Sequence, residues 1–277
     1  MLLKTNMVSN QWLQDNIEHP KLIVLYTQMD NPVLGGIDDK PIGYVPNSIF
    51  FDFEIVFCEL GSGLPHTMPS KELFDKEAKK LGINQNSIIV VYDNKGIYCA
   101  PRVWWMFKSM GHELVYVLDG GLPVWLNQRL PTQSHLVSPN KVGNFNGEFN
   151  NSHFICAEEI LQTQTSITIF DARSEGRFNG TQAEPRKGLR SGHIPNSTNL
   201  PFDQCLNGTS LKSTSELKGI FTKLGLDPNM KLVVSCGSGV TACILALAAT
   251  QAGFKKIAVY DGSWSEWGAR TDLPLEA

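Results

Sequence analysis

The sequence predicts an α/β protein built from two tandem domains of one plan, each a mainly parallel sheet flanked by helices. Three observations support this: the chain has 277 residues, its two halves repeat the same order of motifs, and short apolar runs alternate with helical segments. The length is about twice the commonest domain size, and strands that alternate with helices are typical of parallel sheets. We predict domains at residues 1–135 and 151–277, joined by a linker at 136–150 that is rich in Pro, Asn, Ser and Gly.

The repeat begins with matching segments at residues 45–52 and 194–203, which share a Pro-Asn-Ser turn and an aspartate. A helix with a polar first residue and a glycine after its last turn is expected next in each half, since glycine closes a helix without a side-chain clash. These helices are predicted at residues 70–81 and 214–224, before Gly82 and Gly225.

Each half continues with an unbroken apolar run, at residues 87–92 and 231–235, which predicts a central strand buried on both faces. An apolar helix should follow each strand, at residues 97–110 and 240–252. An Asp-Gly pair and a tryptophan complete both units. They are Asp119-Gly120 with Trp125, and Asp261-Gly262 with Trp267.

Composition narrows the classes of function. The net charge is −3 and no long Lys/Arg run occurs, so neither nucleic acid nor an acidic membrane is an expected partner. The first six residues become polar too early for a signal peptide, and no apolar run could span a bilayer, so we expect a cytoplasmic protein. Its six cysteines lack CxxC or Cys/His spacings, which predicts reduced thiols and neither a metal nor another cofactor.

The repeat breaks at one chemically important position, where Asp93 follows the first central strand and Cys236 the second. In Cys-Gly-Ser-Gly-Val-Thr, residues 236–241, two glycines permit a tight turn with inward-pointing amides, and the next helix adds its positive end. Such a cradle favours an anion, here a thiolate or a persulfide. Cys236 could instead be a small core residue, but open α/β sheets bind ligands at such strand-to-helix turns.

A cysteine phosphatase is disfavoured by the same loop. Those enzymes need an arginine that closes the loop and neutralises the transferring phosphoryl group. This chain has Ala242 there. An uncharged or singly charged sulfur acceptor suits the loop better than a phosphoryl dianion.

These residues resemble the tandem rhodanese-domain sulfurtransferases, and within them the 3-mercaptopyruvate sulfurtransferases, over almost the whole chain. The most specific element is the loop, because thiosulfate-preferring relatives usually carry basic residues where Gly237 and Ser238 stand here. Thiosulfate is a dianion, whereas mercaptopyruvate carries one carboxylate remote from its thiol, so the neutral loop favours mercaptopyruvate. The resemblance implies that the amides of Gly237, Gly239, Val240 and Thr241 stabilise charge on sulfur.

The resemblance also implies that Arg177 and Arg186 hold the carboxylate and keto group of the substrate, which suits the two-pronged guanidinium. Arg173 and Arg190 are nearby alternatives, although Arg173 is also interpreted as structural, with Asp171, at a strand end. The competing interpretation is that these arginines are surface residues paired with neighbouring glutamates.

A Ser–His–acid relay that manages the thiol proton of the substrate is implied as well, with the histidine and the acid supplied by the first domain. Ser238 is the hydroxyl, His66 the histidine, and the acid is Glu54 or Asp52. Residues 55–60 are more apolar than the family pattern and differ slightly in length, which leaves the acid open. His66 could instead be a solvated loop histidine.

The predicted function is ping-pong transfer of sulfur from 3-mercaptopyruvate, through a Cys236 persulfide, to cyanide, a small thiol or thioredoxin, with release of pyruvate. The alternatives are a thiosulfate sulfurtransferase and a non-enzymatic sulfur carrier or regulatory binding module, since fold does not fix function. The first half, with Asp93 in place of a cysteine, is expected to be non-catalytic and to form a wall of the cleft. Its Trp104-Trp105 pair is expected to pack in the core and the domain interface.

Overall fold

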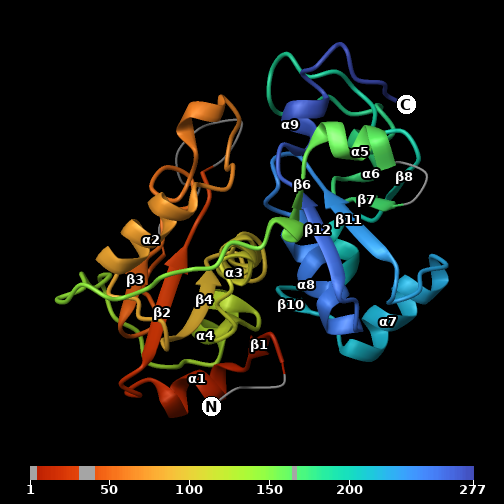
Figure 1. Cartoon of the computed structure of the whole chain (residues 1–277). Coiled ribbons are helices and arrows are strands. Elements are labelled where there is room, and N and C mark those ends of the chain that lie inside the picture. Colours follow the sequence, from red (N-terminus) through yellow and green to blue (C-terminus); the bar gives the residue numbers. More distant parts are fainter. Residues whose placement is uncertain (1–4, 31–40, 164–166) are drawn as a thin grey trace.

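The structure, a computed structural model, describes residues 5–30, 41–163 and 167–277. It contains two halves side by side, each with a five-stranded parallel sheet and helices against it (Figure 1). The predicted fold class is thereby confirmed. The first four residues, on which the signal-peptide argument partly depends, lie outside the described ranges. Among the residues that are described, no helix has both the length and the apolar character needed to cross a bilayer.

The first sheet has the strand order β1-β5-β4-β2-β3, and all neighbouring strands are parallel. Its strands are β1 (Met7–Val8), β2 (Leu22–Thr27), β3 (Ser48–Phe50), β4 (Ile88–Asp93) and β5 (Val115–Leu118). Its helices are α1 (Asn10–Asn16), α2 (Lys71–Lys80), α3 (Ala100–Ser109) and α4 (Gly121–Asn127), with a 3-10 turn at Leu60–Ser62. As predicted, β4 is the central strand, and all of its residues are buried.

The second sheet repeats this topology with the order β6-β12-β11-β7-β8, again parallel throughout. Its strands are β6 (Phe154–Ile155), β7 (Thr168–Asp171), β8 (Ser197–Asn199), β11 (Lys231–Ser235) and β12 (Lys256–Tyr260). Its helices are α5 (Ala157–Thr163), α6 (Glu175–Phe178), α7 (Thr214–Lys223), α8 (Ala242–Ala252) and α9 (Ser263–Trp267). A two-stranded hairpin, β9 (Leu206–Asn207) with β10 (Ser210–Leu211), and 3-10 turns at Asn151–His153 and Phe202–Cys205 complete the described elements of this half.

Helices α2 and α7 end as predicted. Ser70 and Ser213 cap their first turns, and Ser213 forms a reciprocal capping box with Glu216. Gly82 and Gly225 follow the last turns with φ angles of 73° and 74°, in the left-handed region that glycine adopts without strain.

Helices α3 and α8 begin later than predicted, at Ala100 and Ala242. In the first half, the amides of Tyr98 and Cys99 bind the carboxylate of Asp93. In the second half, residues 240 and 241 belong to the cysteine loop. Both corrections have one cause. In each half, the residues before the helix belong to the loop that follows the central strand, so the helix begins only after that loop.

The two halves share a continuous apolar interface. Helix α3 packs against α8, and one cluster of buried apolar side chains extends through both halves. Trp104 and Trp105 are buried in this cluster, and the indole nitrogen of Trp105 donates to the carbonyl of His153 at 3.2 Å. The pair packs in the core, as the sequence suggested.

Residues 136–150, the expected linker, contain neither helix nor strand and lie along the first half. The amide of Val137 donates to Ser48, and the amide of Phe145 donates to Ile83. The Phe145 ring is buried against Phe74 and Phe107. The segment is therefore packed onto the first half, and the exact domain boundaries stay a prediction.

Candidate active site

Cys236 follows β11 at the carboxyl end of the second sheet, and only 2% of the residue is exposed. It contributes to a cavity of about 170 Å³ between the two halves. The first half contributes Met29 and Tyr98; the second contributes Ala172, Arg173, Ser174, Arg177, Pro185, Arg186, Phe202, Cys236, Gly237, Ser238, Val240 and Thr241. The thiol is thus set among cavity-lining residues, not enclosed by aliphatic side chains alone.

The start of α9 holds the backbone of the cysteine loop. The amide of Cys236 donates to Oγ of Ser263 at 3.2 Å, and the carbonyl of Cys236 accepts from the amide of Trp264 at 2.9 Å. The next carbonyl, that of Gly237, accepts from the amide of Ser265 at 2.8 Å. These bonds hold the loop through its own backbone atoms only, so the sulfur of Cys236 takes no part in them.

The first half shows how this kind of loop binds an anion. The carboxylate of Asp93, which is fully buried, accepts backbone hydrogen bonds of 2.9 Å from Lys95 and from three consecutive residues, 98–100. Burial raises the pKa of Asp93 and these hydrogen bonds oppose the rise. Because the cysteine loop occupies the equivalent position in the repeat, a sulfur anion at Cys236 has a structural precedent in the same chain.

Ser238, His66 and Glu54 form a connected chain across the domain interface. Nδ1 of His66 lies 2.9 Å from Oγ of Ser238, and its Nε2 lies 2.9 Å from Oε1 of Glu54. Since a carboxylate only accepts, neutral His66 carries its proton on Nε2 and accepts the Ser238 proton at Nδ1. His66 is 7% exposed, so the solvated-histidine interpretation does not hold.

Asp52 does not reach His66. Its Oδ1 accepts the amides of Glu54 at 3.1 Å and Ile55 at 2.9 Å, and so shapes the turn that presents Glu54. Burial raises the pKa of Glu54. Hydrogen bonds from His66 and from the amide of Asp30 lower it by more, so the pKa of Glu54 is below its usual value. The geometry therefore favours Glu54 over Asp52 as the acid.

Two guanidinium groups lie against the cysteine loop. A Cβ atom on Gly237 would lie 3.0 Å from Nη2 of Arg177 and 3.9 Å from Nη1 of Arg186, so the absence of a side chain lets them approach. Arg177 also donates to Glu184, at 2.6 Å from Nη2 and 3.2 Å from Nε. Within the described ranges, Arg186 has no hydrogen-bonding partner, which leaves its donors for a ligand. Burial lowers the pKa of Arg186 and nearby Cys236 opposes this.

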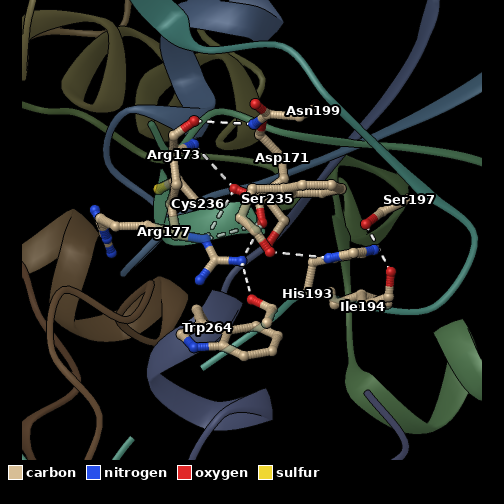
Figure 2. A network of polar contacts seen from close by, with 12 residues as sticks. Asp171, Arg173, Arg177, His193, Ile194, Ser197, Asn199, Ser235, Cys236 and Trp264 are labelled. Atoms are coloured by element: carbon tan, nitrogen blue, oxygen red, sulfur yellow. Dashed lines mark hydrogen bonds and ion pairs between the residues drawn. The ribbon is translucent and has the colours of Figure 1, made fainter. Parts of the chain in front are cut away.

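The alternative arginines are committed to the framework. Arg173, with no exposed side-chain surface, pairs with Asp171 and Glu184 and lies 4.2 Å from the ring centre of Trp264. Figure 2 shows Arg173 with Asp171 and Trp264, beside Cys236. Arg190 donates only to backbone carbonyls among the described residues, those of Trp267, Gly268, Arg270 and Leu273. Neither is free to hold a substrate.

The remaining loop residues divide into two groups. Gly237, Val240 and Thr241 line the cavity, whereas Gly239 faces Asp261 and Arg102 beneath the loop. Its φ of 75° requires glycine.

Sequence reasoning missed the aromatic part of the cavity wall. Tyr98 and Phe202, one from each half, meet edge to face with ring centres 5.9 Å apart. Burial raises the pKa of Tyr98 to about 12, so its hydroxyl stays protonated near neutral pH. No motif marks either residue. The available signal was the repeat, which places Tyr98 in the loop equivalent to the cysteine loop.

The fold and the site together define an α/β protein with a cysteine at a strand-to-helix turn, opposite cationic and proton-handling groups. Comparison with known proteins identifies the family. The Rhodanese-like domain matches residues 9–128 and 156–270. The chain therefore belongs to the rhodanese family, with one domain in each half.

Individual relatives span nearly the whole chain. It is 37% identical over 280 residues to the 3-mercaptopyruvate sulfurtransferase of Escherichia coli, covering 98% of both chains. It is 38% identical to the thiosulfate sulfurtransferase of Rattus norvegicus, covering 95% of this chain and 92% of the relative. The crystal structure of SseA from Escherichia coli, a 3-mercaptopyruvate sulfotransferase, superimposes with a TM-score of 0.83 at 34% identity, covering 95% of this chain and all of that one.

We predict that Glu54→Gln lowers kcat for sulfur transfer by about 10- to 100-fold, part of the 10²–10⁴-fold that general acid–base catalysis supplies. Glutamine cannot provide the negative charge that orients and stabilises His66. Asp52→Asn keeps the oxygen that accepts the two amides, so it serves as the matched control and should change kcat little. Steady-state rates of both variants provide the test, and an Asp52→Asn loss equal to that of Glu54→Gln would contradict the assignment.

The hydrogen bond between Glu54 and His66 also predicts how stability depends on pH. The pKa of Glu54 is lower in the folded protein than its usual 4.5, so its contribution to stability is present above about pH 4.5 and is lost as pH falls through the folded pKa. We expect the difference in free energy of unfolding between wild type and Glu54→Gln to be largest near neutral pH and to shrink below pH 4.5. Urea titrations across this range measure it. A difference that grows in acid would have the wrong sign.

Proposed function

We propose that this protein transfers sulfur from 3-mercaptopyruvate to a thiophilic acceptor through a persulfide on Cys236, and releases pyruvate. The observation that carries the proposal is that Cys236, Ser238 and two guanidinium groups line one small cavity, with His66 hydrogen-bonded to Ser238 behind it. The full-length likeness to a relative named for this activity supports it.

In the first half-reaction, the Cys236 thiolate attacks the sulfur of mercaptopyruvate, an S–S bond forms, and the C–S bond breaks. The electron pair of the broken bond stays with the three-carbon fragment, which leaves as pyruvate enolate. Ser238, His66 and Glu54 take the thiol proton of the donor, and the enolate carbon gains a proton. Overall, the Cys236 thiolate and mercaptopyruvate become the Cys236 persulfide anion and pyruvate. The step is nucleophilic catalysis with general acid–base assistance.

The arginines orient the donor. Arg186, whose donors are free within the described part of the chain, suits the carboxylate, and Arg177, already paired with Glu184, is placed to polarise the keto oxygen. Electron withdrawal at the carbonyl stabilises the enolate as it leaves. The contacts of Arg177 and Arg186 with the donor would therefore both bind it and increase the rate.

In the second half-reaction, the acceptor attacks the outer sulfur of the persulfide and the Cys236 thiolate is regenerated. Cyanide or a small thiol suits a cavity of about 170 Å³. Thioredoxin, as a protein acceptor, would have to bring its own thiolate to the cavity. A cytoplasmic location, where thiols remain reduced, is part of this proposal.

The persulfide can be tested directly by mass spectrometry. Wild-type protein incubated with mercaptopyruvate should gain the mass of one sulfur atom, mapped by peptide analysis to Cys236, and should release one pyruvate for each persulfide. Cys236→Ser should do neither, and Cys156→Ser, the same change at an exposed cysteine, should behave as wild type. A persulfide at another cysteine would sink the mechanism, and absence of turnover with every donor would favour a binding module.

A thiosulfate sulfurtransferase is the second candidate, since a relative of that name matches at 38% identity. Loss of one charge-assisted contact costs about 1.5–3 kcal/mol. We therefore expect Arg186→Ala to lower kcat/KM for mercaptopyruvate by about 10- to 100-fold. The exposed neighbour Lys187 provides the control variant Lys187→Ala, which should lower it little. Wild-type kcat/KM higher for thiosulfate than for mercaptopyruvate would select the second candidate.

A further inference from the structure

A partly buried ion pair between the domains, with the Asp261 side chain 20% exposed, holds the backbone around His66. Arg102, on α3 of the first half, has no exposed surface; its Nη2 donates to the carbonyl of His66 at 2.6 Å and lies 2.7 Å from Oδ1 of Asp261. Oδ2 of Asp261 accepts the amide of Met68 at 2.7 Å. The pair therefore binds the chain on both sides of Thr67, with one partner from each half.

This support matters because His66 has an unusual backbone conformation. Its φ is 62°, in the left-handed region that non-glycine residues rarely occupy. Such a conformation persists only where the surroundings impose it. Fixing the carbonyl of residue 66 and the amide of residue 68 imposes it here, and the histidine ring is thereby directed at Ser238.

The same pair lies under the cysteine loop. A Cβ atom on Gly239 would lie 3.0 Å from the carbonyl oxygen of Asp261 and 3.4 Å from Nη1 of Arg102. Asp261 also lies two residues before Ser263, whose hydroxyl accepts the amide of Cys236. One ion pair thus contacts the segment that carries the histidine and the loop that carries the nucleophile.

We propose that Arg102 and Asp261 are positioning residues that set His66 against Ser238 across the domain interface. Within the part of the chain that the structure describes, neither contacts Arg177 or Arg186, so they act through His66 and Ser238. The inference deepens the proposed sulfur transfer and depends on it. An ion pair is weak evidence for stability in itself, and its placement around a strained catalytic segment is what argues for a positioning role.

The repeat supplies a matched control. Asp119 occupies the place of Asp261 in the first half, and its Oδ1 accepts the amide of Leu211 from the second half at 3.3 Å. It crosses the interface at the β9–β10 hairpin, and no arginine pairs with it among the described residues. Asp119→Asn removes the same charge at the same kind of junction without touching the His66 segment.

The experiment measures kcat and KM for mercaptopyruvate in Asp261→Asn, Asp119→Asn and wild type. We expect Asp261→Asn to lower kcat by about 10- to 100-fold, a share of the 10²–10⁴-fold from general acid–base catalysis. KM should not change, because Arg177 and Arg186 keep their contacts. Asp119→Asn should leave kcat as in wild type. If Asp261→Asn and Asp119→Asn have equal kcat, the proposal is wrong.

Two further variants separate positioning from loss of folding. The double variant Arg102→Met with Asp261→Asn leaves no uncompensated buried charge and still removes the donor to the His66 carbonyl. It should fold, by circular dichroism, and show the same kcat loss. In a His66→Asn background, Asp261→Asn should cause no additional fall in kcat. A multiplicative fall there would contradict action through His66.

Mass spectrometry keeps this proposal distinct from the proposed function. Wild type and Asp261→Asn should both carry sulfur on Cys236 after long incubation with mercaptopyruvate, the variant more slowly. Failure of wild type to gain sulfur would overturn the proposed function. Equal rates of persulfide formation in wild type and Asp261→Asn would overturn the positioning role alone.

Discussion

The candidate site depends on the turn that follows the central strand of each half. Parallel strands β4 and β11 both end at a turn that leads into an apolar helix, and such turns present backbone amides to an anion. In the first half the chain supplies the anion itself, since Asp93 accepts four amide hydrogen bonds. In the second half Cys236 takes that place, and its sulfur is free of the hydrogen bonds that fix the loop. Asp93 therefore fills the turn of the first half, whereas the turn of the second half holds the cysteine at which we propose covalent chemistry.

Neither half is a complete site. The candidate nucleophile Cys236 and Ser238 belong to the second half, whereas His66 and Glu54 belong to the first. The distances of 2.9 Å at each end of the histidine require the halves to be held in register. The shared apolar cluster around α3 and α8 supplies the general association, but apolar packing is not directional. Directional contacts such as the ion pair between Arg102 and Asp261 supply the alignment that proton transfer needs.

The repeat made the fold predictable, because turns, helix ends and central strands recur with the same spacing and each recurrence supports the other. Cys236 was singled out as the candidate nucleophile for the same reason, as the one chemical difference between equivalent turns, and its catalytic role stays a prediction. The acid could not be singled out, because Glu54 and Asp52 both lie near the turn and only the amide contacts of Asp52 exclude it. The start of α3 was missed because nothing in its sequence signals that the amides of Tyr98 and Cys99 bind Asp93. The start of α8 was missed because residues 240 and 241, which belong to the cysteine loop, read as part of the helix that follows. Arg102 was missed because its partner lies 159 positions away in the other half, beyond any local pattern.

The arginine cluster shows why the site suits a donor with one negative charge. Arg173 is neutralised by Asp171, and Arg177 by Glu184, so Arg186 is the cation of this group whose charge is not already paired among the described residues. A monocarboxylate such as mercaptopyruvate matches that single charge and still leaves its thiol uncharged at the cysteine. A dianion such as thiosulfate would bring its second charge beside the Cys236 thiolate, where Gly237 and Ser238 offer no cation. The donor preference that we propose follows from two features of the fold: the neutral cysteine loop, and the pairing of Arg177 with the buried side chain of Glu184.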